Sequence, residues 1–198
     1  YCKRMGDVHA YPRVPHTAQT IQFLRTLGEG TKPVFLSEYG IGSAVDLWRV
    51  VRHYESLGKE SAEDAQFYRA KLNAFLADWE RWRLADCFGR PEDYFAQCIR
   101  KMAGQRLLGL NAIRSNPNLV GHNLTGTGDQ GMTGEGLFTT WRELKPGTTD
   151  ALFDGLAPLR WCLFAEPLNL YRGNPGKLEA ILANEDALLP GAYPVRLQ

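Results

Sequence analysis

The sequence lacks the features that mark several common classes of protein. Its 198 residues carry 23 basic and 22 acidic side chains, so the net charge of +1 creates no field that would attract nucleic acid or an acidic membrane. No basic run with interleaved aromatic residues occurs, and no apolar stretch approaches the roughly 18 residues that a membrane span needs. We therefore expect neither nucleic acid nor a membrane as a partner.

Cysteine is scarce and shows no motif. The four cysteines form no C-x-x-C pair, which argues against a structural zinc site and a redox motif. Buried thiols and one or two disulfides both remain open, and the pattern identifies no compartment. The cysteines are Cys2, Cys87, Cys98 and Cys162.

The composition is that of an ordinary globular protein, with 44% hydrophobic and 23% charged residues. The chain starts at Tyr1 without a signal-like segment and ends at Gln198 in a predicted β region. Both ends are expected to be cuts in a longer protein, whose N-terminal half would be missing here.

The most informative segment is Lys32–Gly40 (KPVFLSEYG). Its apolar run, Val34–Leu36, predicts a short strand that is buried on both faces, as in a parallel sheet. Glu38 would lie at the carboxyl end of this strand, where parallel α/β barrels place their catalytic groups. We take Glu38 as the candidate catalytic residue; the alternative is a solvated carboxylate at a strand end.

Elements before and after this strand predict a βαβ unit followed by a helical region. Residues 5–11 alternate like a strand, and residues 17–27 have helical spacing. The helical region covers residues 45–57, 63–84 and 91–107. Its Trp79 and Trp82 could form a sugar platform, but packing against a neighbouring element is the preferred interpretation.

A further strand is predicted at residues 118–123, followed by a loop at 124–136 that holds five glycines. Such loops on a barrel rim usually line a site. After Pro158, short apolar runs alternate with turn residues, which is typical of an antiparallel β-sandwich. We predict one domain at 1–157 and the start of a second at 158–198.

Polar side chains gather at the predicted strand ends, which converge on one face of a parallel barrel. They are Asp7, His9, Tyr11, Glu38, Tyr39, His122 and Asn123. A carboxylate with neutral donors beside it suits sugar chemistry. Asp7 and His9 could instead be half of a metal site, but no third and fourth ligand stands at a recognisable spacing, so no metal is predicted.

The glycine-rich loop and the segment after it contain further polar and aromatic residues that could line a site. Asp129 and Glu135 lie in the glycine-rich loop and are most simply solvated turn residues. Trp141 could stack on a sugar ring or pack in the core. Gly126 and Gly128 resemble part of a phosphate-binding loop, but no Lys-Ser/Thr follows, so nucleotide binding is discounted.

Together these segments resemble glycoside hydrolase family 2, the family of β-galactosidases, β-glucuronidases and β-mannosidases. The matching segments are Asp7–Pro12, Lys32–Gly40, Gly121–Asn123 with its loop, Lys145–Gly147, Leu182–Asp186 and Pro190–Tyr193. The resemblance implies strands six to eight of a (β/α)₈ TIM barrel followed by the beginning of an Ig-like β-sandwich.

The same resemblance implies roles for single residues. Glu38 matches the catalytic nucleophile after the seventh strand, and Tyr11 or His9 matches the group that hydrogen-bonds it. The general acid/base of the family follows the fourth strand and would lie outside this chain. Departures are the absence of a Trp at the exit of the eighth strand, where His122 and Asn123 stand, and a helical region longer than one barrel helix.

We therefore expect a fragment of a retaining β-glycosidase that needs no cofactor and acts on carbohydrate. The expected substrate-binding residues are Asp7, His9, Tyr11, Tyr39, His122, Asn123, Asp129 and Trp141. The fragment alone is expected to be inactive, because the proton donor is missing and half a barrel exposes open sheet edges. The alternatives are a non-catalytic carbohydrate-binding or scaffold protein and a hydrolase of a different carbohydrate clan.

Overall fold

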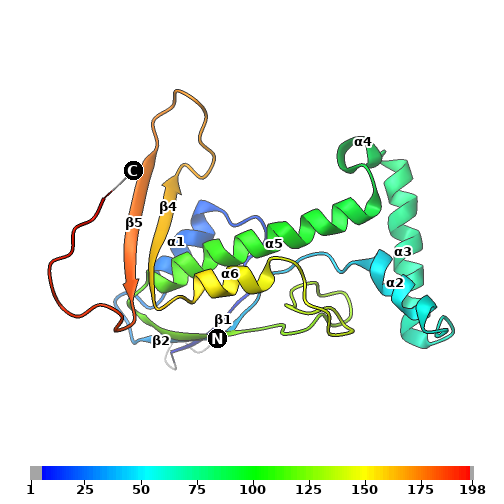
Figure 1. Ribbon diagram of the computed structural model, residues 1–198, viewed down its shortest axis with the longest axis horizontal. Helices are drawn as coiled ribbons and strands as arrows, with labels where there is room; N and C mark the ends of the chain where they lie inside the picture. The colour runs from blue at the N-terminus through cyan, green and yellow to red at the C-terminus, as the bar shows by residue number, and fades with distance from the viewer. Residues whose placement is uncertain (1–5, 197–198) are drawn as a thin grey trace.

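A three-stranded parallel sheet organises the larger part of the chain. The structure, a computed structural model, describes residues 6–196. The strands are β1 (Asp7–Ala10), β2 (Val34–Tyr39) and β3 (Leu119–Leu124), and β2 lies in the middle (Figure 1). Since all three run in the same direction, their carboxyl ends share one edge of the sheet.

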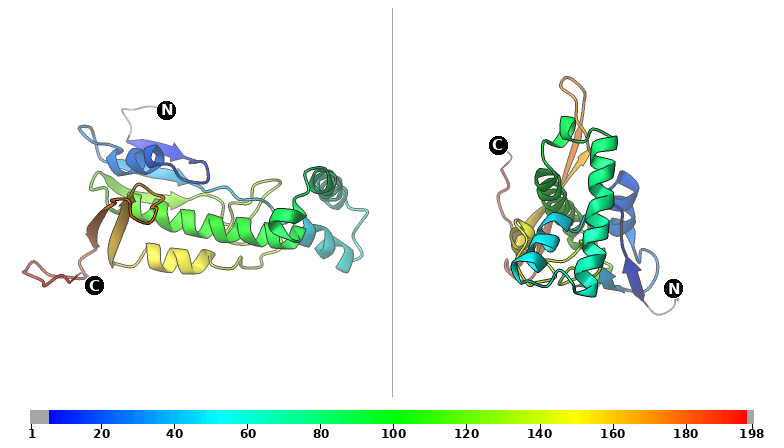
Figure 2. Two further views of the ribbon diagram at one scale, coloured as in Figure 1. Left: turned by 90° about the horizontal axis from the view of Figure 1, so that it is seen from above. Right: turned by 90° about the vertical axis from the view of Figure 1, so that its right-hand side faces the viewer.

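Helices α1 (Ala18–Thr26) and α5 (Pro91–Arg114) cover one face of this sheet (Figures 1 and 2). Leu36 and Tyr39 of β2 are fully buried in the core on that side, together with Leu24 of α1. On the other face, Phe35 is 43% exposed and its ring lies against Gly121. Parallel sheets are normally covered on both faces, so this sheet has one face without cover in the described part of the chain.

Local sequence signals explain where the helices begin. The Thr17 hydroxyl accepts the backbone N–H of Thr20 at 3.2 Å and caps α1. The Asp46 carboxylate does the same for α2 (Leu47–Ser56), with the N–H of Arg49 at 3.0 Å. Pro91 is the first residue of α5, where its missing N–H costs nothing.

Helices α2, α3 (Glu63–Arg81) and α4 (Ala85–Phe88) form an arm at the end of the molecule away from β4 and β5 (Figure 1). The arm has its own apolar cluster with the first turns of α5, including Val51, Leu72 and Phe95. Trp79 is buried among aromatic rings, whereas Trp82 is 63% exposed. The two indoles therefore do not form one platform.

A β-hairpin follows α6 (Thr148–Gly155) and consists of β4 (Leu159–Glu166) and β5 (Lys177–Asn184). Cys162 and Phe164 join the core formed with α1 and α5. Arg25 of α1 donates two hydrogen bonds to Glu179, at 3.1 and 2.8 Å. The hairpin is thus fastened to the helices that cover the sheet.

The expected mixed α/β class is confirmed, with a three-stranded sheet, a two-stranded sheet and six helices among the described residues. The barrel portion and the β-sandwich stay predictions. The described part of the last apolar run, residues 192–196, contains no strand. Of the cysteines in the described range, Cys87, Cys98 and Cys162 are free thiols, and Cys2 lies outside that range.

Candidate functional site

Glu38 lies on the uncovered face of the sheet. Glu38 pairs with His9 of β1, after a register shift between Asp7 and His9, while Tyr39 pairs with Ala10 on the covered face. The Glu38 side chain is 39% exposed. The carboxylate therefore stands near the carboxyl edge of the middle strand, accessible from the open face.

The side chains of Tyr11 and His9 both contact one oxygen of this carboxylate. The Tyr11 hydroxyl donates a short hydrogen bond to Glu38 Oε2, and His9 Nδ1 lies 3.1 Å from the same oxygen. The hydrogen bond to Glu38 raises the pKa of the Tyr11 phenol, so the phenol remains a donor around neutral pH. Donors of this kind stabilise a carboxylate in its ionised form.

The loop after β3 adds Thr125 to this group. Its backbone N–H donates to the Tyr39 carbonyl at 2.9 Å, which holds the loop against the end of β2. The Thr125 side chain interacts with the Tyr11 hydroxyl and lowers the pKa of the phenol, opposing the effect of Glu38. The phenol is thereby held by Glu38 of β2 and by Thr125 in the loop after β3.

Glu135 is a second carboxylate beside Tyr11. A Cβ on Gly40 would lie 2.3 Å from Glu135 Oε2 and 2.9 Å from the Tyr11 ring, and a Cβ on Gly126 would lie 2.3 Å from Glu135 Cγ. Glycine at both positions therefore makes room for the Glu135 side chain. Burial raises the pKa of Glu135, and the nearby charge of Glu38 acts in the same direction.

Asp129 is engaged inside the glycine-rich loop. Its Oδ1 accepts a hydrogen bond from Lys145 Nζ at 2.5 Å and another from the N–H of Gly136 at 2.9 Å. Both charged side chains are almost fully buried. Burial raises the pKa of Asp129 and lowers that of Lys145, and the ion pair opposes both changes. This carboxylate stabilises the loop, and its expected sugar contact gains no support from its position.

Tyr39 and His122 face the helices rather than the open face. Tyr39 is fully buried, and burial raises the pKa of its phenol. Its ring meets the His122 ring edge-on at 6.4 Å. His122 lies near the charges of Arg114 and Glu185, and burial lowers its pKa. A ligand on the open face would not reach these two side chains.

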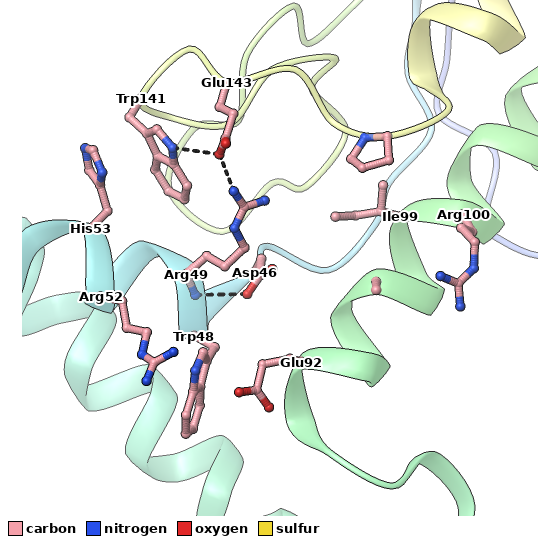
Figure 3. A pocket seen from close by; sticks show the side chains of 12 residues that line it. Asp46, Trp48, Arg49, Arg52, His53, Glu92, Ile99, Arg100, Trp141 and Glu143 are labelled. Atoms are coloured by element: carbon pink, nitrogen blue, oxygen red, sulfur yellow. Dashed lines mark hydrogen bonds and ion pairs between the residues drawn. The ribbon is translucent and has the colours of Figure 1, made fainter.

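The remaining predicted residues are dispersed. Asp7 is exposed and pairs with Phe35 on the open face, and Asn123 is exposed on β3. Trp141 lies in a separate cavity of about 600 Å³ between α2, α5 and the loop that precedes α6 (Figure 3). There it stacks on His53 and donates to Glu143 at 3.1 Å. The structure thus brings together His9, Tyr11 and Glu38 but leaves Trp141 apart from them.

Sequence reasoning missed Glu135, Thr125 and the buried Arg106 of α5, whose Nη2 donates to the Glu135 carbonyl at 2.6 Å. The one available signal was the glycine on each side of Glu135, because glycine marks turns. Within residues 6–196, no group of three or more His, Cys, Asp or Glu side chains could hold a metal ion. No helix in that range is long and apolar enough to cross a membrane.

Comparison with known proteins identifies no family for this chain. No protein-family model, no curated protein and no solved structure matches the chain. A function for this chain is therefore argued from the geometry around Glu38.

Proposed function

We propose that this chain carries the nucleophile side of a retaining β-glycosidase site similar to that of glycoside hydrolase family 2. The observation that supports this most is the Glu38 carboxylate, which stands on the open face of the middle strand with Tyr11 and His9 on the same oxygen. A nucleophilic carboxylate must be positioned and accessible, and Glu38 meets both requirements.

The architecture that fits this function is a piece of a (β/α)₈ barrel. Strands β1, β2 and β3 are parallel and adjacent in chain order, as successive strands of such a barrel would be. Their open face would then look into the barrel, and their carboxyl edge would form part of the active-site rim. In the same proposal, β4 and β5 begin an Ig-like sandwich.

The reaction would proceed in two steps. In the first, a Glu38 oxygen bonds to the anomeric carbon while the bond to the leaving oxygen breaks, and a second carboxylic acid protonates that oxygen. In the second, water attacks the same carbon, the ester to Glu38 breaks, and the second carboxylate takes the proton from water. Tyr11 and His9 position Glu38 throughout. The second carboxyl group is proposed to lie outside this chain, and no cofactor is needed.

Covalent labelling tests this proposal without the second carboxyl group. Dinitrophenolate leaves without protonation, so a dinitrophenyl 2-deoxy-2-fluoro-β-glycoside needs only the nucleophile to form a glycosyl-enzyme. We would incubate the 198-residue chain with the galacto, gluco, manno and glucurono reagents and record its intact mass. The proposal predicts a single covalent addition with at least one reagent.

Two results would contradict it. Absence of any covalent addition would favour the non-catalytic carbohydrate-binding alternative. Addition to the Glu38→Gln variant at the rate of the unchanged chain would favour a hydrolase of another clan, with its nucleophile elsewhere.

A further inference from the structure

The turn that carries Glu135 is held in place by three buried charged side chains. Lys145 Nζ donates to the Gly134 carbonyl at 2.9 Å, and Arg106 Nη2 donates to the Glu135 carbonyl at 2.6 Å. Asp129 Oδ1 accepts the N–H of Gly136 at 2.9 Å. Three consecutive residues are thus each fixed through their backbone.

This arrangement is costly for a simple surface turn. Burying a charged side chain carries a desolvation penalty of several kcal/mol, at least in part repaid by its partners. Arg106 is fully buried, and its Nε and Nη1 have no hydrogen-bond partner. Buried charged residues of this kind are typical of a supporting shell that holds a functional side chain in one position.

Close packing fixes the turn further. A Cβ on Gly134 would lie 2.3 Å from the Ser43 carbonyl oxygen, and one on Gly136 would lie 2.4 Å from the Asp129 backbone nitrogen. Within residues 134–136, Glu135 is therefore the single residue with a side chain, and it lies over Gly40 beside Tyr11. These hydrogen bonds and close contacts together fix the position of the Glu135 carboxylate.

Glu135 and Tyr11 also line one open pocket of about 540 Å³, with Arg13 at its wall. Tyr11 joins this pocket to Glu38, because its hydroxyl donates to the Glu38 carboxylate. A sugar whose anomeric carbon faces Glu38 would therefore extend past Tyr11 toward Glu135. We infer that Glu135 is a specificity residue: its carboxylate accepts hydrogen bonds from sugar hydroxyls and excludes uronic acids from the site.

The charge balance supports a substrate without a carboxylate. A uronate would meet the negative charges of Glu38 and Glu135, and like charges brought together cost several kcal/mol. Arg13 is exposed, and its charge is screened by water. The charges of Arg106 and Lys145 act on Glu135 and oppose the rise in its pKa caused by burial, but both side chains are buried and neither lines the pocket. Neutral hydroxyls, in contrast, form charge-assisted hydrogen bonds with a carboxylate, which are about twice as strong as neutral ones.

Matched sugars test the inference by binding alone. Methyl β-glucoside and methyl β-glucuronide differ only at C6, and the galacto pair provides the other C4 configuration. Affinity of the 198-residue chain for each sugar would be measured by NMR titration with Glu38 intact, because methoxide is a poor leaving group without the second carboxylic acid and no reaction competes with binding. We expect the better neutral sugar to bind about tenfold or more tightly than its uronate partner.

Glu135→Gln is the decisive variant, because the amide has the size of the carboxylate. It also leaves the backbone carbonyl of residue 135, which Arg106 contacts, unchanged. It should reduce the preference for the neutral sugar at least about threefold. Glu29→Gln, at an exposed carboxylate in the turn after α1, should leave the preference unchanged. Equal affinity for both members of each pair, tighter binding of a uronate, or an unchanged preference in Glu135→Gln would overturn the inference.

The inference rests on the proposed site at Glu38, but the two fail separately. Failure to label Glu38 together with a Glu135-dependent sugar preference would refute the proposed chemistry and leave the specificity residue standing. Labelling of Glu38 without that preference would refute the specificity residue alone. Absence of any sugar binding would overturn the inference itself.

Discussion

Two carboxylates of similar chemistry occupy opposite environments in this molecule. Asp129 is 7% exposed, and its Oδ1 takes a lysine ammonium and a backbone N–H. The Glu38 side chain is 39% exposed, and its partners are a phenol and an imidazole. A carboxylate whose charge is fully neutralised by a buried cation stabilises structure, whereas one held by weaker donors on an open face remains available for reaction.

Replacing a carboxylate by its amide should have its largest effect at Glu38, where it should affect covalent labelling rather than stability. Glu38→Gln should reduce covalent labelling at least about 1,000-fold, because an amide is not a competent nucleophile. Its melting temperature should stay close to that of the unchanged chain, since the lost interactions are exposed. Intact mass spectrometry and a thermal melt measure the two quantities, and a large loss of stability with retained labelling would reverse the comparison.

Asp129→Asn should give the opposite pattern. The substitution leaves the Lys145 ammonium buried without its counter-charge, so the free energy of unfolding should fall by about 3 kcal/mol. Urea denaturation checks this, with Asp150→Asn at an exposed position as the matched control. A change within about 0.5 kcal/mol would mean that Asp129 does not stabilise the loop.

Tyr11→Phe tests whether the phenol positions Glu38 on the open face of the sheet. Loss of the phenolic donor leaves Glu38 less well positioned, so labelling should slow by about 10- to 100-fold with little change in stability. Tyr171→Phe removes a hydroxyl from a 74% exposed residue and should have no effect on labelling. Equal labelling rates in both variants would remove Tyr11 from the site.

A pH dependence of stability should come from the covered side of the molecule. Burial lowers the pKa of both His16 and His122, so the folded chain resists their protonation. Below the ordinary histidine pKa of about 6.5, the unfolded chain binds protons that the folded chain does not. Stability should therefore be complete near neutral pH and fall as the pH is lowered toward about 5.

The variant His122→Asn should flatten this slope, and urea denaturation at a series of pH values measures it. A stability that stays constant or rises over the same acid range would contradict the buried position of these imidazoles.

The sequence was enough to predict β1 to β3 and the main helices between them, but it did not predict α4, and residues 192–196 form no strand. The apolar run Val34–Leu36 predicted β2, and helical spacing predicted α1, α2, α3 and α5. Which side chain faces which way depended on the register shift after Leu36, and residue spacing alone does not reveal such a shift. The shift lets both Leu36 and Tyr39 lie on the covered face. Glu38 and Tyr39, which the sequence had grouped together, face opposite sides because successive residues of a strand alternate.

The role of Glu135 could not be predicted for a different reason. Its support comes from Arg106, 29 positions earlier on α5, and from Lys145, beyond the loop. A polar residue in a glycine-rich loop is usually a solvated turn residue, and only tertiary packing distinguishes the exception. The position of Trp141 also depends on tertiary packing, since it stacks on His53 of α2 in another cavity.

The nucleophilic role of Glu38 is tested by identifying the residue that carries the covalent sugar. After incubation with a dinitrophenyl 2-deoxy-2-fluoro-β-glycoside, the chain would be digested and the modified peptide sequenced by tandem mass spectrometry. The added sugar is expected on Glu38, within the peptide containing residues 32–40. A sugar on Glu135, on Asp129 or on any other residue would contradict it.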